Sequence, residues 1–215
     1  MVTSVGPTTL LHSLEGLIDK LDFQNLTHHC TVYGGMMGSP ASTAANLHYY
    51  PVWNEAAEQY LRNVLERPGS GGDAPSGFPT PIFESSWTMS TLLASGYTIE
   101  DFPTEDTQNI IVYLQQALET QDGLLGFAPD FVPDADDTAR ALLALSQLGV
   151  QIDPFSLVKY FEAPDHFQTY KLDRDPSFSA NANTLLALPK APNRTEFVSQ
   201  IEKNSQIPSL LLEEW

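Results

Sequence analysis

The stretch Pro133-Asp134-Ala135-Asp136-Asp137-Thr138-Ala139 is the most informative part of this chain, because it places three carboxylates within four residues. Apolar residues continue at helical spacing from Thr138 to Leu148, and Gly149 follows as a stop. The pattern predicts a helix whose aspartates lie in the preceding loop and the first turn, where one of them can cap unpaired N–H groups. Like charges at this spacing raise the proton affinity of at least one carboxyl group. A carboxyl group that keeps its proton can act as an acid.

Helical periodicity recurs on both sides of this stretch, with prolines and glycines between the periodic segments. Helices are predicted over residues 9–21, 40–50, 55–66, 82–95, 107–120, 138–148, 155–161, 183–188 and 195–203. Small and polar residues begin several of them, which lets a backbone or an anion approach closely. This pattern favours an all-α fold built from repeated helical hairpins, as in α–α barrels.

Composition limits the function classes. The 215 residues allow one large domain or parts of two. The net charge of −17 argues against nucleic acids and anionic membrane surfaces as partners. No apolar run approaches the roughly 20 residues that span a bilayer. The single cysteine, Cys30, excludes an internal disulfide framework and suits a reducing compartment, so a cytoplasmic protein is predicted.

Further elements accompany the aspartate motif in the order found in one enzyme family. They are Leu11-His12-Ser13-Leu14-Glu15-Gly16, Ser39-Pro40-Ala41-Ser42-Thr43-Ala44, Phe83-Glu84-Ser85-Ser86-Trp87, Asp165-His166-Phe167-Gln168-Thr169-Tyr170 and Ser177-Phe178-Ser179-Ala180-Asn181-Ala182-Asn183. Together with Asp-x-Asp-Asp-Thr-Ala, they resemble the fungal branch of the class II diterpene cyclases. In this branch, copalyl diphosphate synthase and ent-kaurene synthase activities often share one chain. Class II enzymes protonate a carbon–carbon double bond and leave the diphosphate in place.

The resemblance implies helices of a βγ didomain, with the active site between the two α–α barrels. Residues 1–97 would form a partial γ-like domain, and residues 98–215 a partial β-like domain that carries the aspartate motif. Family members normally have substantial sequence before the Leu-His-Ser element and beyond the length of this chain. The chain is therefore expected to be incomplete at both ends. Association with a class I α domain, or continuation into one, is expected as well.

The resemblance also assigns the chemistry, which is cyclisation of geranylgeranyl diphosphate to copalyl diphosphate. Asp136 would be the acid, and Asp134 and Asp137 would keep it protonated and orient its proton through hydrogen bonds and charge repulsion. His12 would hold the water that accepts the final proton. Ser76 stands where plant cyclases of the ent series place an asparagine beside this water, so it is the expected substrate-binding position. Magnesium is the expected cofactor for an anionic diphosphate on an acidic protein, with ligands not assigned.

Other interpretations explain parts of the pattern. The aspartates could only cap a helix or hold calcium, although Ala139 and Leu145 replace the glycine and glutamate of an EF-hand loop. His12 could be a partly buried histidine that bonds to a neighbour. The whole chain could be a non-catalytic fragment or interaction domain of a longer terpene synthase. A hydrolase with paired carboxylates explains only the acidic cluster. A squalene- or hopene-type cyclase shares that cluster but not the Leu-His-Ser element.

Overall fold

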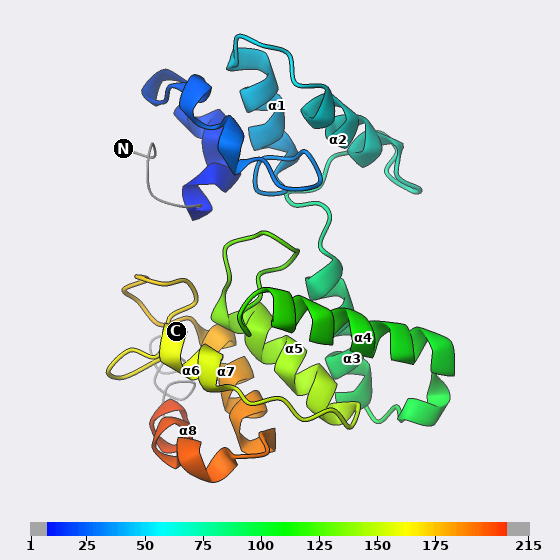
Figure 1. Cartoon of the computed structure of the whole chain (residues 1–215), viewed down its shortest axis with the longest axis vertical. Coiled ribbons are helices and arrows are strands. Elements are labelled where there is room, and N and C mark those ends of the chain that lie inside the picture. The colour runs from blue at the N-terminus through cyan, green and yellow to red at the C-terminus, as the bar shows by residue number, and fades with distance from the viewer. Residues whose placement is uncertain (1–7, 206–215) are drawn as a thin grey trace. The chain divides into compact units, whose positions relative to one another are not determined.

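The computed structural model describes residues 8–205, and its regular structure there is helical (Figure 1). The α-helices are α1 Pro40–Tyr49, α2 Glu55–Glu66, α3 Pro81–Ala94, α4 Thr104–Thr120, α5 Ala135–Gln147, α6 Phe155–Phe161, α7 Phe178–Ala187 and α8 Val198–Asn204. The 3₁₀-helices are η1 Thr9–Lys20, η2 Phe23–Asn25, η3 Thr27–His29, η4 Ile99–Asp101, η5 Leu188–Lys190 and η6 Arg194–Phe197. Residues 8–205 contain no β-strand, only isolated bridges. The predicted all-α class is confirmed.

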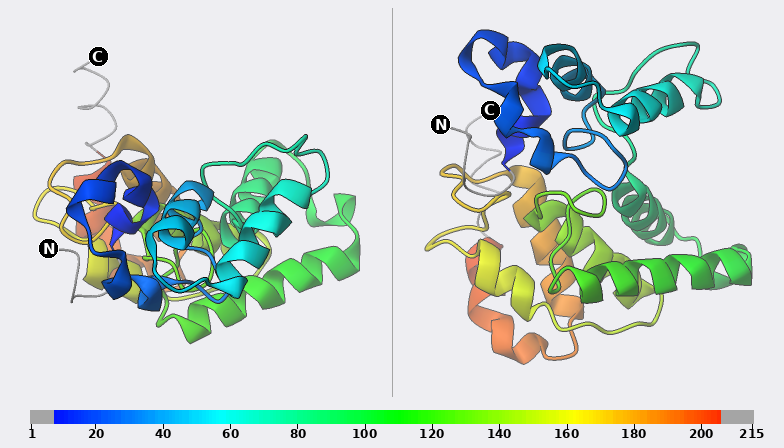
Figure 2. Two further views of the ribbon diagram at one scale, coloured as in Figure 1. Left: turned by 90° about the horizontal axis from the view of Figure 1, so that it is seen from above. Right: turned by 45° about the horizontal axis from the view of Figure 1, so that its top comes forward.

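The described residues form two compact units. Unit 1 comprises residues 8–80 and the short segment 130–132, whereas unit 2 comprises residues 81–129 and 133–205. Figure 2 gives two further views in which the helices of each unit can be followed. These units divide after residue 80, and α3 packs against α5 within unit 2. The domain boundary after residue 97 came from the family resemblance and stays a prediction. Which family domain each unit represents stays a prediction.

Unit 1 is built from η1, α1 and α2. Helix α1 begins at Pro40 because Ser39 accepts a hydrogen bond from the Ser42 N–H and proline suits the first helical position. The predicted helix over residues 9–21 is a kinked 3₁₀ segment, with non-helical angles at Ser13. One reason is that the Leu14 N–H donates to Ser42 Oγ (2.8 Å) rather than to a carbonyl of its own helix.

Gly38 is required by the packing of unit 1. Its φ is +61°, and a Cβ there would lie 2.3 Å from Cζ of Phe131. Phe131 belongs to the short segment of unit 1 that directly precedes the aspartate motif, and it is 4% exposed. The aromatic side chain therefore packs where only a glycine leaves room for it.

In unit 2, α5 packs against α3, α4, α6 and α7. Its apolar face is part of a buried core that includes Leu114, Leu125, Leu142, Leu145, Phe161, Phe167 and Leu188. Helix α7 begins at Phe178, although the sequence predicted a start at residue 183. The buried face of its first turns consists of small and polar residues and has no apolar periodicity. The sequence pattern therefore did not predict a helix there.

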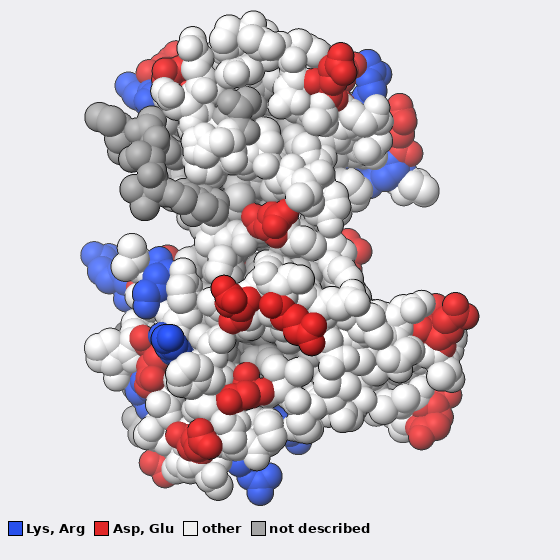
Figure 3. Space-filling model, viewed as in Figure 1, with Lys and Arg blue, Asp and Glu red and all other residues white. Residues whose placement is uncertain are grey.

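Carboxylates are spread over the viewed surface in Figure 3, in keeping with the net charge of −17. Within residues 8–205, no helix is both long enough and apolar enough to cross a membrane.

Candidate active site

The aspartate motif lies at the start of α5. Asp134 is the N-cap, and its Oδ1 accepts a hydrogen bond from the Asp137 N–H (2.7 Å), so one aspartate caps the helix as predicted. The Thr138 hydroxyl accepts from the Leu125 N–H (2.9 Å) and lies 2.6 Å from the Asp134 carbonyl oxygen. The threonine of the motif therefore fixes the turn that presents the carboxyl groups.

Burial and mutual repulsion perturb two of these carboxyl groups. Asp134 is 3% exposed, and burial, followed by the charge of Asp137, raises its pKa well above the usual range. Asp137 is 5% exposed, and burial raises its pKa to about 6. A hydrogen bond from the Trp87 Nε1–H (2.9 Å) to Asp137 opposes this rise, because it favours the charged form. The pair therefore holds protons at pH values where ordinary aspartates have lost them.

Asp136 differs from its neighbours because it is partly exposed and faces α7. One carboxyl oxygen accepts from the Ser179 hydroxyl (2.7 Å), and the other accepts from the side-chain amide of Asn183. The sequence predicted that Asp134 and Asp137 would orient Asp136 through hydrogen bonds. In the part of the chain that the structure describes, the side chains that donate to Asp136 come from α7. The role of Asp134 and Asp137 in keeping Asp136 protonated and orienting its proton stays a prediction.

Sequence reasoning did not single out Ser179 and Asn183. Their only signal was their place in the Ser177–Asn183 block, and their contact with Asp136 depends on how α7 packs against α5. The segment between α6 and α7 also contacts the motif, because the Ala135 N–H donates to the Thr169 carbonyl (2.9 Å) beside Tyr170. The pKa of Tyr170 is raised by burial and then by the charges of the aspartate motif.

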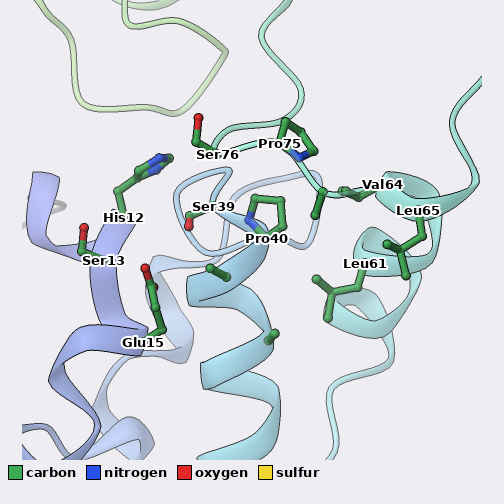
Figure 4. Close-up of a pocket in the computed structure, with 13 residues that line it drawn as sticks. His12, Ser13, Glu15, Ser39, Pro40, Leu61, Val64, Leu65, Pro75 and Ser76 are labelled. Atoms are coloured by element: carbon green, nitrogen blue, oxygen red, sulfur yellow. The ribbon is translucent and has the colours of Figure 1, made fainter. Parts of the chain in front are cut away.

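Unit 1 contains a cavity of about 700 Å³ (Figure 4). His12 and Ser76, the two predicted site residues of this unit, both line it. Figure 4 shows the His12 ring extending toward the segment that carries Ser76. The remaining wall is formed by residues from η1, α1, α2 and the following loop: Ser13, Glu15, Ser39, Pro40, Ala41, Ala44, Leu61, Val64, Leu65, Ala74 and Pro75.

The His12 ring is oriented by the backbone. Its Nδ1 lies 3.0 Å from the Met37 carbonyl oxygen, which can only accept, so Nδ1 carries the hydrogen. In the neutral ring the acceptor lone pair is then on Nε2. Nearby, the Ser42 hydroxyl donates to Glu15 (2.9 Å). His12 is thus a hydrogen-bonded histidine, as one interpretation held, and it also lines a cavity, as the other requires.

The structure brings His12 together with Ser76 in unit 1, and it brings the three aspartates together in unit 2. Their roles in catalysis stay predictions. Among residues 8–205, no group of three or more His, Cys, Asp or Glu side chains could hold a metal ion.

The described residues are helical, and an acidic motif caps the buried helix α5. Comparison with known proteins shows which family has these features. No family model matches the chain. It is 43% identical over 201 residues to the bifunctional ent-kaurene synthase of Gibberella fujikuroi, covering 93% of this chain and 21% of that protein. It is 43% identical over 198 residues to the copalyl diphosphate synthase of Talaromyces verruculosus, covering 91% and 20%.

Among solved structures, the ent-copalyl diphosphate synthase of Arabidopsis thaliana matches with a TM-score of 0.78 and 28% identity, over 97% of this chain and 28% of that one. The chain belongs to the class II diterpene cyclase family and is related to its fungal copalyl diphosphate and ent-kaurene synthases. It spans about a fifth of the length of these curated relatives. The predicted family is confirmed.

Proposed function

We propose that the chain supplies the acid centre of a class II diterpene cyclase, which converts geranylgeranyl diphosphate to copalyl diphosphate. The observation that carries this proposal is the contrast within the motif. Asp134 and Asp137 are buried carboxyl groups with raised pKa values, whereas Asp136 is partly exposed between two neutral donors. Of the three, Asp136 is therefore the one that a substrate can reach. The Arabidopsis relative, which was solved with an aza analogue of geranylgeranyl thiolodiphosphate, supports this substrate class.

In the proposed reaction, Asp136 transfers its proton to the terminal double bond of the substrate. The electron pair of that bond forms the new C–H bond, and the resulting tertiary cation is attacked in turn by the internal double bonds, which closes two rings. Ser179 and Asn183 donate to the two oxygens of Asp136 and stabilise the carboxylate that remains. The reaction is an isomerisation, because the bicyclic cation finally loses one proton.

We assign this final proton loss to the cavity of unit 1. Its volume of about 700 Å³ lies within the range of small-molecule sites. Leu61, Val64 and Leu65 supply apolar wall for a hydrocarbon, while His12 and Ser76 supply polar groups. A water held by His12 and the Ser76 hydroxyl would accept the proton. Few polar groups on an apolar wall also limit the water that could quench the cation.

Three further assignments belong to the proposal. Magnesium is the proposed counter-ion of the diphosphate, with its ligands in this chain not assigned. The bifunctional relative supports continuation of the whole protein into a class I α domain. A cytoplasmic location remains proposed from the composition.

A second candidate is a segment that binds without turnover. It rests on the cavity of unit 1, whose lining residues all belong to that unit. Such a segment would retain the cavity of unit 1 and the motif of unit 2 but would leave the substrate unchanged.

The test is incubation of the 215-residue chain with geranylgeranyl diphosphate and magnesium, followed by phosphatase treatment and gas chromatography–mass spectrometry. Asp136→Asn removes the acid at constant size, and Asp175→Asn, at an exposed position, is the matched control. Copalol from the wild type and the control, but not from Asp136→Asn, is expected. Geranylgeraniol alone from a folded wild-type chain would favour the second candidate.

A further inference from the structure

Arg140 contacts the aspartate motif through an aromatic ring. It lies on α5 one turn beyond Asp136, and its guanidinium carbon is 4.2 Å from the centroid of the Trp87 ring on α3. One guanidinium nitrogen, Nη1, donates to the Ser90 hydroxyl (3.2 Å), also on α3. The guanidinium is therefore held over the indole face between two packed helices.

The surroundings of Arg140 are unfavourable for a residue that only packs. Its Nε is buried and has no hydrogen-bond partner among the described residues. Burial lowers the pKa of the guanidinium, and the charge of Asp136 only partly opposes this. A partly buried cation with an unsatisfied buried donor carries a free-energy cost that an unbranched apolar side chain would avoid. An arginine here therefore needs a reason that outweighs this cost.

Trp87 gives such a reason. Its Nε1–H donates to Oδ1 of Asp137 (2.9 Å), and its ring packs against Phe83 with centroids 5.1 Å apart. A cation over the indole face is attracted by the ring electrons and limits rotation of the ring. It also polarises the indole, which makes the N–H a stronger hydrogen-bond donor. Arg140, Trp87 and Asp137 thereby form a linked set within unit 2.

We propose that Arg140 is a positioning residue that clamps Trp87 with its indole N–H on Asp137, and thereby orders the aspartate motif for proton transfer. The contact of Arg140 with Trp87 can be tested without substrate. The effect of that contact on turnover rests on the proposed function and is tested with substrate.

The first measurement is the ¹H–¹⁵N resonance of the Trp87 indole in the 215-residue chain. The sequence has three tryptophans, and the Trp87→Phe variant identifies the peak. Arg140→Met, which keeps length but removes the charge, is expected to move this resonance toward that of a weakly bonded indole. Arg140→Lys restores a cation without the planar guanidinium and is expected to give an intermediate position.

Unit 1 offers a matched control. The Trp53 Nε1–H donates to Glu58 (2.7 Å), which also pairs with Arg62 (2.6 Å). The Arg62→Met variant therefore removes an arginine beside another indole–carboxylate bond, one that is exposed and not stacked. It is expected to affect the Trp53 resonance and to leave that of Trp87 in place.

The second measurement is steady-state kinetics with geranylgeranyl diphosphate. Misplacement of the motif is expected to lower kcat about tenfold to a hundredfold in Arg140→Met, with KM changed by no more than about threefold. Arg140→Lys is expected to recover part of this loss. If Arg140 only filled space, a lysine of different shape would not restore kcat.

The outcomes decide the proposal. An unchanged Trp87 resonance in folded Arg140→Met overturns the clamp, whatever the activity. A shifted resonance with unchanged kcat overturns the positioning role. If the wild-type chain makes no product while the resonance responds as expected, the proposed function fails and the clamp is supported.

Discussion

Replacing Asp137 by asparagine is expected to stabilise the chain, and the gain is expected to grow as the pH rises. The carboxyl group is 5% exposed, and burial raises its pKa to about 6 from the ordinary value of 3.8. Asparagine has the same shape. Its side-chain oxygen can still accept from the Trp87 N–H, and its amide nitrogen can donate to Asp134. The substitution therefore removes the titration and leaves both neighbours bonded.

The sign and size follow from linkage between folding and protonation. Well below pH 3.8 the carboxyl group is neutral in both the folded and the unfolded chain, so it carries no ionisation penalty. Between pH 3.8 and about 6 the unfolded chain gives up the proton that the folded chain keeps, and the wild type loses stability as the pH rises. Above about pH 7 the penalty is complete. A difference of about two pKa units corresponds to about 3 kcal/mol. In a domain of this size, that is a melting-temperature difference of about 6–12 °C.

The assay is urea unfolding of the wild type and of Asp137→Asn at several pH values from 4 to 8. Asp175→Asn serves as the control, because that side chain is 80% exposed and the substitution changes the net charge equally. The difference between Asp137→Asn and wild type is expected to rise across this window, while the control difference stays nearly flat. A difference for Asp137→Asn that is equally flat would refute the argument that burial perturbs this carboxyl group.

Three further predictions concern other parts of the chain. Asn183→Leu removes a donor to the proposed acid and is expected to lower copalol formation about a hundredfold, measured by gas chromatography–mass spectrometry. Gly38→Ala is expected to cost about 1–3 kcal/mol in urea unfolding, because its φ is +61° and an aromatic ring occupies the Cβ position; Gly16→Ala, with nothing within 4 Å, is the control. Thr138→Val is expected to cost about 1–3 kcal/mol by calorimetry, since a buried backbone N–H loses its acceptor.

Much of the fold could be predicted from the sequence, because its signals are local. The helix after the aspartate motif was predicted from apolar spacing, and it begins at Ala135 rather than at Thr138 because Asp134 acts as the cap. The predicted helix over residues 9–21 became a kinked 3₁₀ segment, since a serine hydroxyl of α1 takes the Leu14 N–H. That bond joins residues 28 apart, and no local pattern contains it.

The candidate site divides in the same way. Asp134, Asp136 and Asp137 are adjacent in sequence, so their crowding, their place at a helix start and the family they indicate were all legible from the residues. The contacts of Asp136 and Asp137 were decided by the tertiary structure. Asn183 lies 47 residues from Asp136, and Trp87 lies 50 residues from Asp137. Only the packing of α3 and α7 against α5 brings these donors to the carboxyl groups, because side chains this far apart meet through the folded core.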